Sequence, residues 1–470
     1  MPFGTGRSRS FDLRGYRLSR LPPFRMGNCE GSGRLGTMHP RLRATTDTPF
    51  FEEEHRTLAA RLEQFARARI APDSEEVPDY RGRALEFVRR LGAEGWLRYV
   101  VPQRYGGVHE NLDVRSVCLI RRGLARYSSL ADTMFAMQGL GSYPISLSGS
   151  EQLRQRFLPP VARGEWVATF ALTEPQAGSD AASIQTQARR EGSSYVLDGT
   201  KRFISNAGIA DFYVVFAKTD PAQGRRGISA FVVEKECPGL TMTRSLELIA
   251  PHPIGEFALD HCRVPAENLL GREGEGYSIL QQTLEVFRAT VGAAAIGLAE
   301  RSLEEAIAYC LARVQFGKTL SEFQGLRFQL AEMATELEAA RLLVFQAAWK
   351  LDKARCQDSS PLSAKSRGDR RTLVLASSMA KLQATETAQR VIDQALQLHG
   401  GLGVLKGSVV ERLYREVRAL RIYEGTSEIQ KEIIAHQLIE EERESHQPSA
   451  AEANDISESE APVARKRTGL

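Results

Sequence analysis

Two polar segments of the chain combine side chains that suit the binding of a planar ligand. The first follows a short apolar run and reads FALTEPQAGSD over residues 170–180. Its hydroxyls, acids and backbone N–H groups could face the polar edge of a flat ligand, although an ordinary connecting turn is the alternative. The second, KRFISNA at residues 201–207, puts Phe203 and Ser205 two positions apart, so in a strand they share one face of the sheet.

A third segment, RIYEGTSEIQ at residues 421–430, holds a candidate general base. Thr426 is a natural helix N-cap. Glu424 stands just before this cap, flanked by Ile422 and Tyr423. Such a carboxylate can be desolvated, which raises its pKa toward the value that abstraction of a proton from a weak carbon acid requires. A capping or surface glutamate is the alternative interpretation of this segment.

Other patterns carry less chemistry. GREGEG at residues 271–276 lacks the spacing and the lysine of a phosphate-binding loop. His399 precedes two glycines, but no G-x-S-x-G motif supports a serine hydrolase, and packing beside a ligand is the better interpretation. The six cysteines are scattered without a C-x-x-C pair, so we expect reduced thiols and no metal site.

The charge distribution excludes further classes of protein. The 470-residue chain has a net charge of +4, but residues 45–440 hold 49 basic and 49 acidic residues. A neutral body argues against nucleic-acid binding. No apolar run approaches the ~20 residues of a membrane-spanning helix. Residues 1–45 are rich in Arg, which predicts either a disordered extension or an organellar transit peptide, and residues 441–470 are expected to be a disordered, charged tail.

The hydrophobic periodicity and the local composition of the sequence predict an α+β fold in three parts. Residues 46–165 are helical by periodicity, with an apolar stripe at Leu58, Leu62, Phe65 and Ile70. Residues 166–275 hold short β-branched and aromatic runs separated by turn residues, which predicts an antiparallel β domain, with Asp198-Gly199 as a hairpin turn. Residues 276–440 return to long helices with small-residue faces, typical of a tight bundle, and residues 354–371 interrupt them as an expected exposed loop.

Together the segments T-E-P-x-A-G-S-D and Y-E-G-T-S-E-I-Q resemble the acyl-CoA dehydrogenase family of flavoproteins, over about residues 50–440. The resemblance implies an N-terminal helical domain, a central β domain and a C-terminal four-helix bundle. It also implies a bound FAD between the β domain and the bundle, and a second subunit that completes the site. The family commonly forms tetramers that are dimers of dimers, so a homotetramer is expected.

The resemblance implies a set of FAD contacts by position. Many relatives carry Trp where this chain has Phe203, and Thr where it has Ser205; both changes keep an aromatic ring and a hydroxyl. Three of the implied residues, Arg313, Phe316 and Gln324, match contacts that a neighbouring subunit supplies. The implied contacts are Phe170, Leu172, Thr173, Gly178, Ser179, Phe203, Ser205, Arg313, Phe316, Gln324, Gln397, Gly400, Gly401, Thr426 and Glu428.

The resemblance also assigns the catalytic and substrate residues. Glu424 matches the usual family base, and the alternative position used by some relatives holds Phe287, which cannot accept a proton. The implied acyl-CoA contacts are Ser179, Glu285, Arg288, Tyr423 and Gly425.

The implied reaction is α,β-dehydrogenation of an acyl-CoA thioester, in which Glu424 takes the α-proton and the flavin takes the β-hydride. An electron-transfer flavoprotein would reoxidise the cofactor. An acyl-CoA oxidase and a flavin-bearing binding protein of low activity are the alternatives. We expect a bacterial-type cytoplasmic enzyme, with the mitochondrial matrix as the alternative, and the sequence leaves acyl length, branching and ring preference open.

Overall fold

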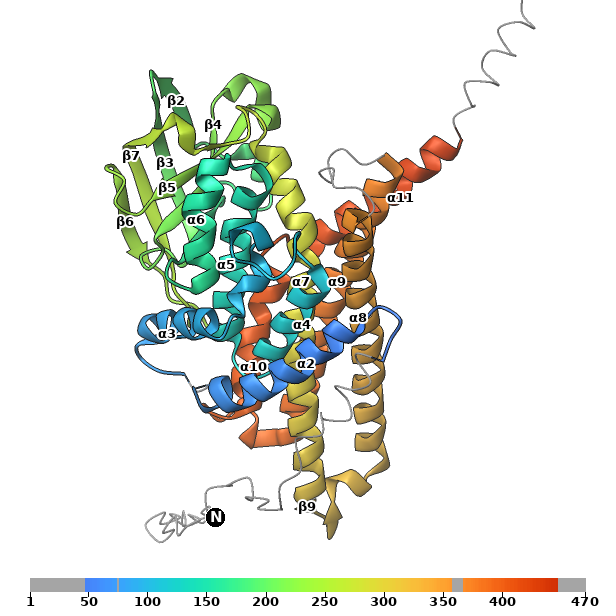
Figure 1. Ribbon diagram of the computed structural model, residues 1–470. Coiled ribbons are helices and arrows are strands. Elements are labelled where there is room, and N and C mark those ends of the chain that lie inside the picture. Colours follow the sequence, from blue (N-terminus) through green and yellow to red (C-terminus); the bar gives the residue numbers. More distant parts are fainter. Residues whose placement is uncertain (1–46, 74–75, 357–366, 447–470) are drawn as a thin grey trace, which may run out of the picture.

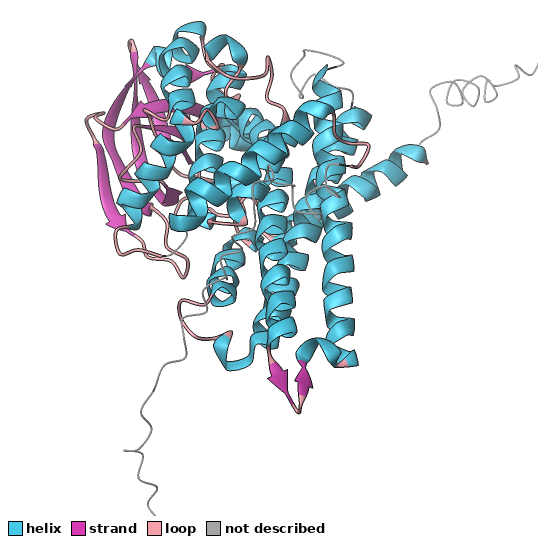
Figure 2. Ribbon diagram, turned by 60° about the horizontal axis from the view of Figure 1, so that its bottom comes forward, coloured by secondary structure: helices cyan, strands magenta, loops and turns pink. Residues whose placement is uncertain are grey.

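The computed structural model describes residues 47–73, 76–356 and 367–446, so both expected tails lie outside the described residues. Within these ranges a group of helices comes first, a β-sheet follows, and long helices end the chain (Figure 1). The sheet lies at one side of the molecule, and the long helices extend away from it (Figure 2). The predicted order of helices, strands and helices is therefore confirmed. None of the helices in the described ranges is long and apolar enough to cross a membrane.

The N-terminal helices begin at side-chain caps. Asp79, Asp113, Ser128 and Ser150 each accept a hydrogen bond from a backbone N–H in the first turn of the helix that they precede. The predicted apolar stripe is buried and faces the core. The helices are α2 (Glu53–Phe65), α3 (Tyr80–Ala93), α4 (Val114–Ala125), α5 (Ser129–Ser148) and α6 (Glu151–Arg163).

The central sheet runs in the order β6-β7-β3-β2-β4-β5-β8, and β1 pairs with β4. Most of its pairings are antiparallel, as expected, but β1 lies parallel to β4 and β2 touches β4 in parallel at one residue pair. The sheet is therefore mixed, because the long segment between β1 and β4 carries the chain back to the same end of the sheet. The strands are β1 (Ala168–Ala171), β2 (Gln187–Glu191), β3 (Ser194–Ser205), β4 (Phe212–Lys218), β5 (Ile228–Glu234), β6 (Leu240–Ser245), β7 (Ile254–Pro265) and β8 (Leu269–Leu270).

The hairpin predicted at Asp198-Gly199 is wrong. Both residues lie inside β3, where the register against β7 shifts between Leu197 and Gly199 as a β-bulge. The hairpin turn comes earlier, between β2 and β3. Gly199 serves close packing here, since a Cβ at this position would lie 2.4 Å from the Oγ1 atom of Thr186.

The C-terminal helices pack closely through small residues. A Cβ at Gly297 would lie 2.2 Å from the backbone oxygen of Arg122 in α4, and one at Gly292 would lie 2.8 Å from the Val344 side chain. Residues 354–356 and 367–371 of the expected loop are helical, as parts of α8 and α9, and residues 357–366 lie outside the described residues. The elements are α7 (Gly276–Ala312), β9 (Val314–Gln315), β10 (Lys318–Thr319), α8 (Gln324–Cys356), α9 (Arg367–His399), α10 (Val409–Val417) and α11 (Ser427–Ser445).

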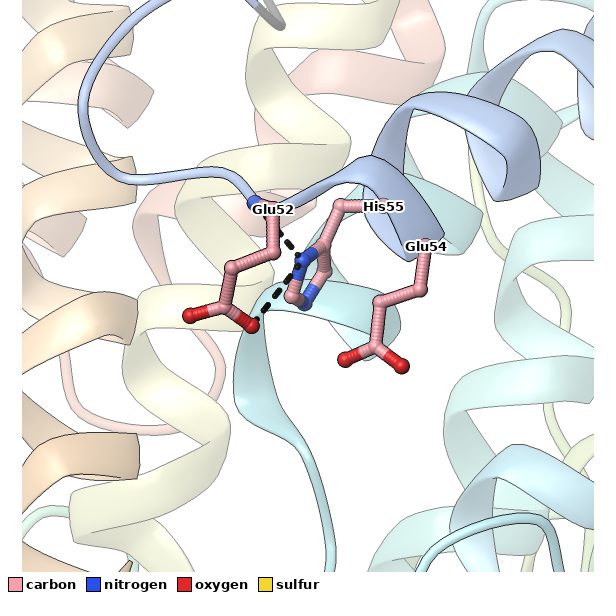
Figure 3. A group of neighbouring side chains, drawn as sticks. All are labelled: Glu52, Glu54 and His55. Atoms are coloured by element: carbon pink, nitrogen blue, oxygen red, sulfur yellow. Dashed lines mark hydrogen bonds and ion pairs between the residues drawn. The ribbon is translucent and has the colours of Figure 1, made fainter.

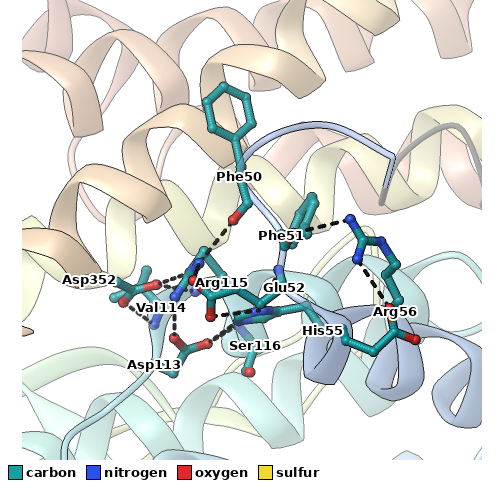
Figure 4. A network of polar contacts seen from close by, with 11 residues as sticks. Phe50, Phe51, Glu52, His55, Arg56, Asp113, Val114, Arg115, Ser116 and Asp352 are labelled. Atoms are coloured by element: carbon teal, nitrogen blue, oxygen red, sulfur yellow. Dashed lines mark hydrogen bonds and ion pairs between the residues drawn. The ribbon is translucent and has the colours of Figure 1, made fainter.

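A buried polar network joins the N-terminal helices to the bundle (Figure 4). Arg115 of α4 donates from Nε to Asp352 of α8 over 2.8 Å and from Nη1 to Glu52 over 3.1 Å. Asp352 also accepts from the backbone N–H of Val114 at 2.7 Å. Burial, together with the neighbouring Asp113 carboxylate, raises the pKa of Asp352 to about 8. The network fixes α2, α4 and α8 relative to one another.

Candidate active site

A cavity of about 1590 Å³ lies between the sheet and the helices. Its wall comes from the loop after β1, the end of β3, the segment before β7, and helices α5 and α7, and the turn before α11 closes it. Small-molecule pockets typically measure roughly 300–1,000 Å³, so this cavity has room for two ligands side by side.

The turn that carries Glu424 has an uncommon backbone. Glu424 has φ of 55° and Gly425 has φ of 93°, so two consecutive residues adopt left-handed conformations, which cost energy for a residue with a Cβ. Surrounding hydrogen bonds hold the turn. The Nζ of Lys381 in α9 donates to the Gly425 carbonyl at 2.8 Å, and the Gln430 amide donates to the same oxygen at 3.1 Å. Thr426 caps α11 by accepting from the Ile429 N–H, as predicted.

Glu424 is half-buried on the cavity wall, and its Oε2 atom is fully buried. This atom has no hydrogen-bond partner among the described residues. Burial raises the pKa of Glu424, while the positive charges of Arg121, Lys381 and Arg288 oppose this rise. A desolvated carboxylate without a hydrogen-bond partner is poised to accept a proton from a molecule in the cavity.

Cationic and polar residues surround Glu424. Burial lowers the pKa of Arg288, whose Nε has no hydrogen-bond partner among the described residues. Glu285 accepts from Arg370 at 2.9 Å. Phe287 is buried and packs edge-on against Tyr143, with 5.9 Å between ring centroids. Its phenyl side chain cannot accept a proton, so it offers no alternative base.

The sheet side of the cavity presents the two segments singled out from the sequence. Phe203 has 53% of its surface exposed although it is a large aromatic residue, and its φ is 55°. In the same strand, the buried Lys201 donates to Glu174 at 2.8 Å. An exposed ring, nearby hydroxyls and unpartnered polar atoms across the cavity fit a flat, polar cofactor such as a flavin. The expected site residues on the cavity wall are Phe170, Leu172, Thr173, Gly178, Ser179, Phe203, Ser205, Glu285, Arg288, Tyr423, Glu424, Gly425 and Thr426.

The other expected cofactor residues do not line the cavity. Glu428 is exposed in the first turn of α11. The remainder lie at the far end of the bundle, around the β9–β10 hairpin and the end of α9 (Figure 1). From Arg288 on the cavity wall to its end at Ala312, α7 runs about 36 Å. The residues at the far end are Arg313, Phe316, Gln324, Gln397, Gly400 and Gly401.

The far end of the bundle is an exposed surface in a single chain. Phe316 is 94% exposed. The ring of His399 stacks on Tyr309 with 4.4 Å between centroids, so this histidine packs against α7 rather than against the cavity. One chain therefore cannot bring both sets of expected residues to a single cofactor.

Three residues beside the expected site were not predicted from the sequence. Arg121 lines the cavity, is buried and pairs with Asp132. Its positive charge opposes the rise in the pKa of Glu424. Lys381 holds the Gly425 carbonyl. His252 contacts the hydroxyl of Ser205. A lysine within a helix and a histidine within a loop carry no local signal of such contacts.

A group of acidic residues and a histidine near the N-terminus does not fit a metal site. Glu52, Glu54 and His55 bring their ligand atoms close together (Figure 3). However, the Nδ1 of His55 accepts from the backbone N–H of Glu52 at 3.2 Å, and its Nε2 bonds to Asp113 at 3.1 Å. Because both ring nitrogens are occupied, neither is available to a metal ion.

Three parts of the chain match three domains of one family. Residues 52–165 match the N-terminal domain of acyl-CoA dehydrogenases, residues 169–262 match the middle domain, and residues 274–439 match the C-terminal domain. An acyl-CoA dehydrogenase of Bacillus subtilis is 38% identical over 383 residues, covering 80% of this chain and 96% of its own. A 3-(aryl)acrylate reductase of Clostridium sporogenes is 36% identical over 393 residues, covering 83% of this chain and 100% of its own.

A further relative, the CarC subunit of the caffeyl-CoA reductase-Etf complex of Acetobacterium woodii, is 34% identical over 399 residues, covering 83% of this chain and 99% of its own. Solved structures agree. Butyryl-CoA dehydrogenase from Megasphaera elsdenii has a TM-score of 0.74 and 32% identity, covering 83% of this chain and 99% of that one. An acyl-CoA dehydrogenase from Bacillus anthracis, complexed with FAD, has a TM-score of 0.77 and 30% identity, covering 88% of this chain and 72% of that one. The chain therefore belongs to the acyl-CoA dehydrogenase family of FAD-dependent oxidoreductases.

Proposed function

We propose that the protein catalyses α,β-dehydrogenation of an acyl-CoA thioester to the trans-2-enoyl-CoA, with Glu424 as the base that takes the α-proton. The observation that carries the proposal is the buried Oε2 atom of Glu424 on the cavity wall, which has no hydrogen-bond partner among the described residues. The resemblance of the chain to acyl-CoA dehydrogenases supports the same assignment.

The turn around Glu424 also supplies a donor for the substrate. An α C–H becomes acidic enough to remove when the thioester oxygen receives hydrogen bonds as negative charge develops on it. The Glu424 backbone N–H has no acceptor among the described residues, and the left-handed turn fixes its direction. We assign this N–H to the thioester oxygen, so that base and oxyanion donor belong to one residue.

The bound cofactor supplies hydride acceptance at the β-carbon. Thr173, Phe203, Ser205 and Thr426 would hold its ring end in the cavity. The residues at the far end of the bundle and Glu428 would contact the cofactor of a neighbouring subunit, so the proposal requires at least a dimer and is consistent with a tetramer formed as a dimer of dimers.

The rim of the cavity suits the phosphates of CoA. Arg225 and Arg226 line it from the turn before β5, are exposed, and form no ion pair among the described residues. Replacing both with Gln is expected to raise the KM for acyl-CoA by roughly tenfold while kcat changes little, because screened surface charges mainly affect binding. Steady-state kinetics at low and high salt test this, since added salt must reduce the difference. A lower kcat at unchanged KM would contradict the assignment.

Electron-transfer flavoprotein is the proposed acceptor, and a relative that is a subunit of an Etf complex supports it. Reduction of an enoyl-CoA is the second candidate, because other relatives are reductases of acrylate and acryloyl-CoA derivatives. In that direction a protonated Glu424 would donate the α-proton, which its raised pKa also favours.

Anaerobic mixing of the FAD-bound enzyme with straight, branched, dicarboxylic, cyclic and aryl acyl-CoAs tests the proposal. We expect at least one saturated acyl-CoA to bleach the flavin at about 450 nm, and added electron-transfer flavoprotein to restore the colour. Peroxide released in air instead would identify an oxidase. Absence of bleaching by every thioester in the panel would contradict the proposal and leave a flavin-bearing binding protein.

A further inference from the structure

Two free cysteines that stand 25 positions apart in the sequence meet near the β6 edge of the central sheet. Cys237 lies in the turn that leads from β5 to β6, and Cys262 lies in β7. Their Sγ atoms are 3.3 Å apart, and the Cys262 thiol donates to Cys237. The Cys237 thiol donates in turn to the Arg263 carbonyl at 3.2 Å. These hydrogen bonds orient the two sulfur atoms toward each other.

Backbone contacts fix the Cys237 turn against β7. The Leu240 N–H closes the turn by donating to the Cys237 carbonyl at 3.1 Å, and the Asp260 N–H donates from β7 to the Gly239 carbonyl at 2.9 Å. Gly239 packs so closely that a Cβ on it would lie 2.8 Å from the Cα of Cys262. The sulfur atoms of a disulfide are about 2.05 Å apart, so this pair needs to approach by only about 1.2 Å.

The two thiols differ in their access to a small oxidant. Cys237 is half-buried between the exposed residues Glu236 and Pro238, whereas Cys262 is fully buried. The hydrogen bond from Cys262 lowers the pKa of Cys237, and the thiolate is the form of cysteine that reacts. An oxidant therefore reaches Cys237 first, and Cys262 is in contact with the sulfur atom that has reacted.

We propose that Cys237 and Cys262 are a redox modification site, at which hydrogen peroxide converts two thiols into a reversible disulfide that stabilises the segment between them. In the first step the Cys237 thiolate attacks one peroxide oxygen. An S–O bond forms, the O–O bond breaks and hydroxide leaves, so the sulfur loses the two electrons that the peroxide gains. In the second step the Cys262 sulfur attacks the Cys237 sulfur. The S–S bond forms, the S–O bond breaks, and the oxygen leaves as water with the proton of Cys262.

The disulfide would close residues 237–262 into a ring that contains part of the cavity wall. This ring includes β6 and residues 247–252, which line the cavity. Ring closure mainly removes conformations from the unfolded chain, so the unfolding equilibrium constant of the FAD-bound enzyme is expected to fall by a factor of roughly 10–10³. Urea denaturation before and after oxidation measures the change. An unchanged or lower midpoint in the cross-linked enzyme would overturn the stabilising role.

Peptide mapping of the FAD-bound enzyme tests whether the disulfide forms. Trypsin cleaves after Lys235, Arg244 and Arg263, so the two cysteines lie in separate peptides, residues 236–244 and 245–263. The enzyme is treated with one equivalent of hydrogen peroxide, its remaining thiols are alkylated in denaturant, and it is digested without reductant. We expect the two peptides to stay joined, with a mass about 2 Da below the sum of their thiol forms, and dithiothreitol to separate them.

Matched variants show whether the pair is specific. Cys237→Ser is expected to retain FAD and to give no joined peptides. Cys310→Ser replaces a buried free thiol of α7 and is expected to give them at the wild-type yield. If peroxide leaves both peptides alkylated, or joins either of them preferentially to the peptide of another cysteine, the inference is wrong. None of these measurements uses an acyl-CoA, so their failure would leave the proposed function standing.

Discussion

A Glu424→Gln enzyme is expected to retain FAD and to lose its bleaching by acyl-CoA by a factor on the order of 10²–10⁴, the usual contribution of a general base. Gln has nearly the same shape as Glu, so the left-handed turn and its hydrogen bonds to Lys381 and Gln430 remain. The amide cannot accept the α-proton. Anaerobic stopped-flow absorbance under single-turnover conditions measures the rate directly.

Glu432→Gln is the matched control, because Glu432 is exposed on α11 and does not line the cavity. This variant is expected to bleach at the wild-type rate. Wild-type bleaching by Glu424→Gln would show that another group takes the proton, and loss of FAD from Glu424→Gln would show that the carboxylate serves cofactor binding instead.

Glu424 also determines whether the rate of each reaction rises or falls with pH. Burial raises the pKa of Glu424, and only its deprotonated form accepts a proton. Dehydrogenation is therefore expected to speed up as pH rises through this raised pKa, and enoyl-CoA reduction is expected to slow over the same range. Pre-steady-state rates in both directions test this, and Glu424→Gln must remove the dependence from each.

Arg121→Met is expected to lower the free energy of unfolding by about 3–5 kcal/mol, the usual result of breaking a buried ion pair. Arg121 is 2% exposed and donates through Nε and Nη2 to both carboxylate oxygens of Asp132, each over 2.9 Å. Its Nη1 donates to Thr290 at 2.9 Å. Removing the guanidinium leaves the buried Asp132 without its cation. Urea denaturation of the FAD-saturated protein measures the loss.

The double variant Arg121→Met, Asp132→Leu separates charge from packing. A buried pair replaced by apolar residues of similar size is often neutral, so this variant is expected to recover most of the lost stability. If it is less stable than the single variant, shape rather than charge balance determines the role of the pair.

Patterns that repeat along the chain could be predicted from the sequence. The apolar stripe of α2 and the three-part order follow from periodicity, and the Thr426 cap follows from a local preference. Local signals failed where a distant partner decides the structure. Asp198-Gly199 has the composition of a hairpin turn, but it lies inside β3 at a bulge where Gly199 packs against Thr186, and the parallel pairing of β1 with β4 has no local signature.

The residues of the candidate site also fall into those with a local signal in the sequence and those without one. Glu424 could be predicted as a candidate because its neighbours along the chain form a cap and an apolar flank and because the segment Y-E-G-T-S-E-I-Q resembles the acyl-CoA dehydrogenase family. Lys381 and His252 could not, because their contacts reach across 44 and 47 positions of the sequence. Lysine in a helix is ordinarily solvated, and nothing adjacent to Lys381 indicates that its ammonium group stabilises a backbone turn on another element.

Helix α9, whose Lys381 donates to the Gly425 carbonyl, also extends to the far end of the bundle. From Lys381 to Gln397 it extends about 24 Å, and there it reaches the segment that we assign to a neighbour's cofactor. Helix α9 would therefore connect the proposed base of one active site with the cofactor proposed to bind at the next. Separating the subunits would release one end of that helix, so turnover per molecule should decline on dilution even where every monomer stays folded.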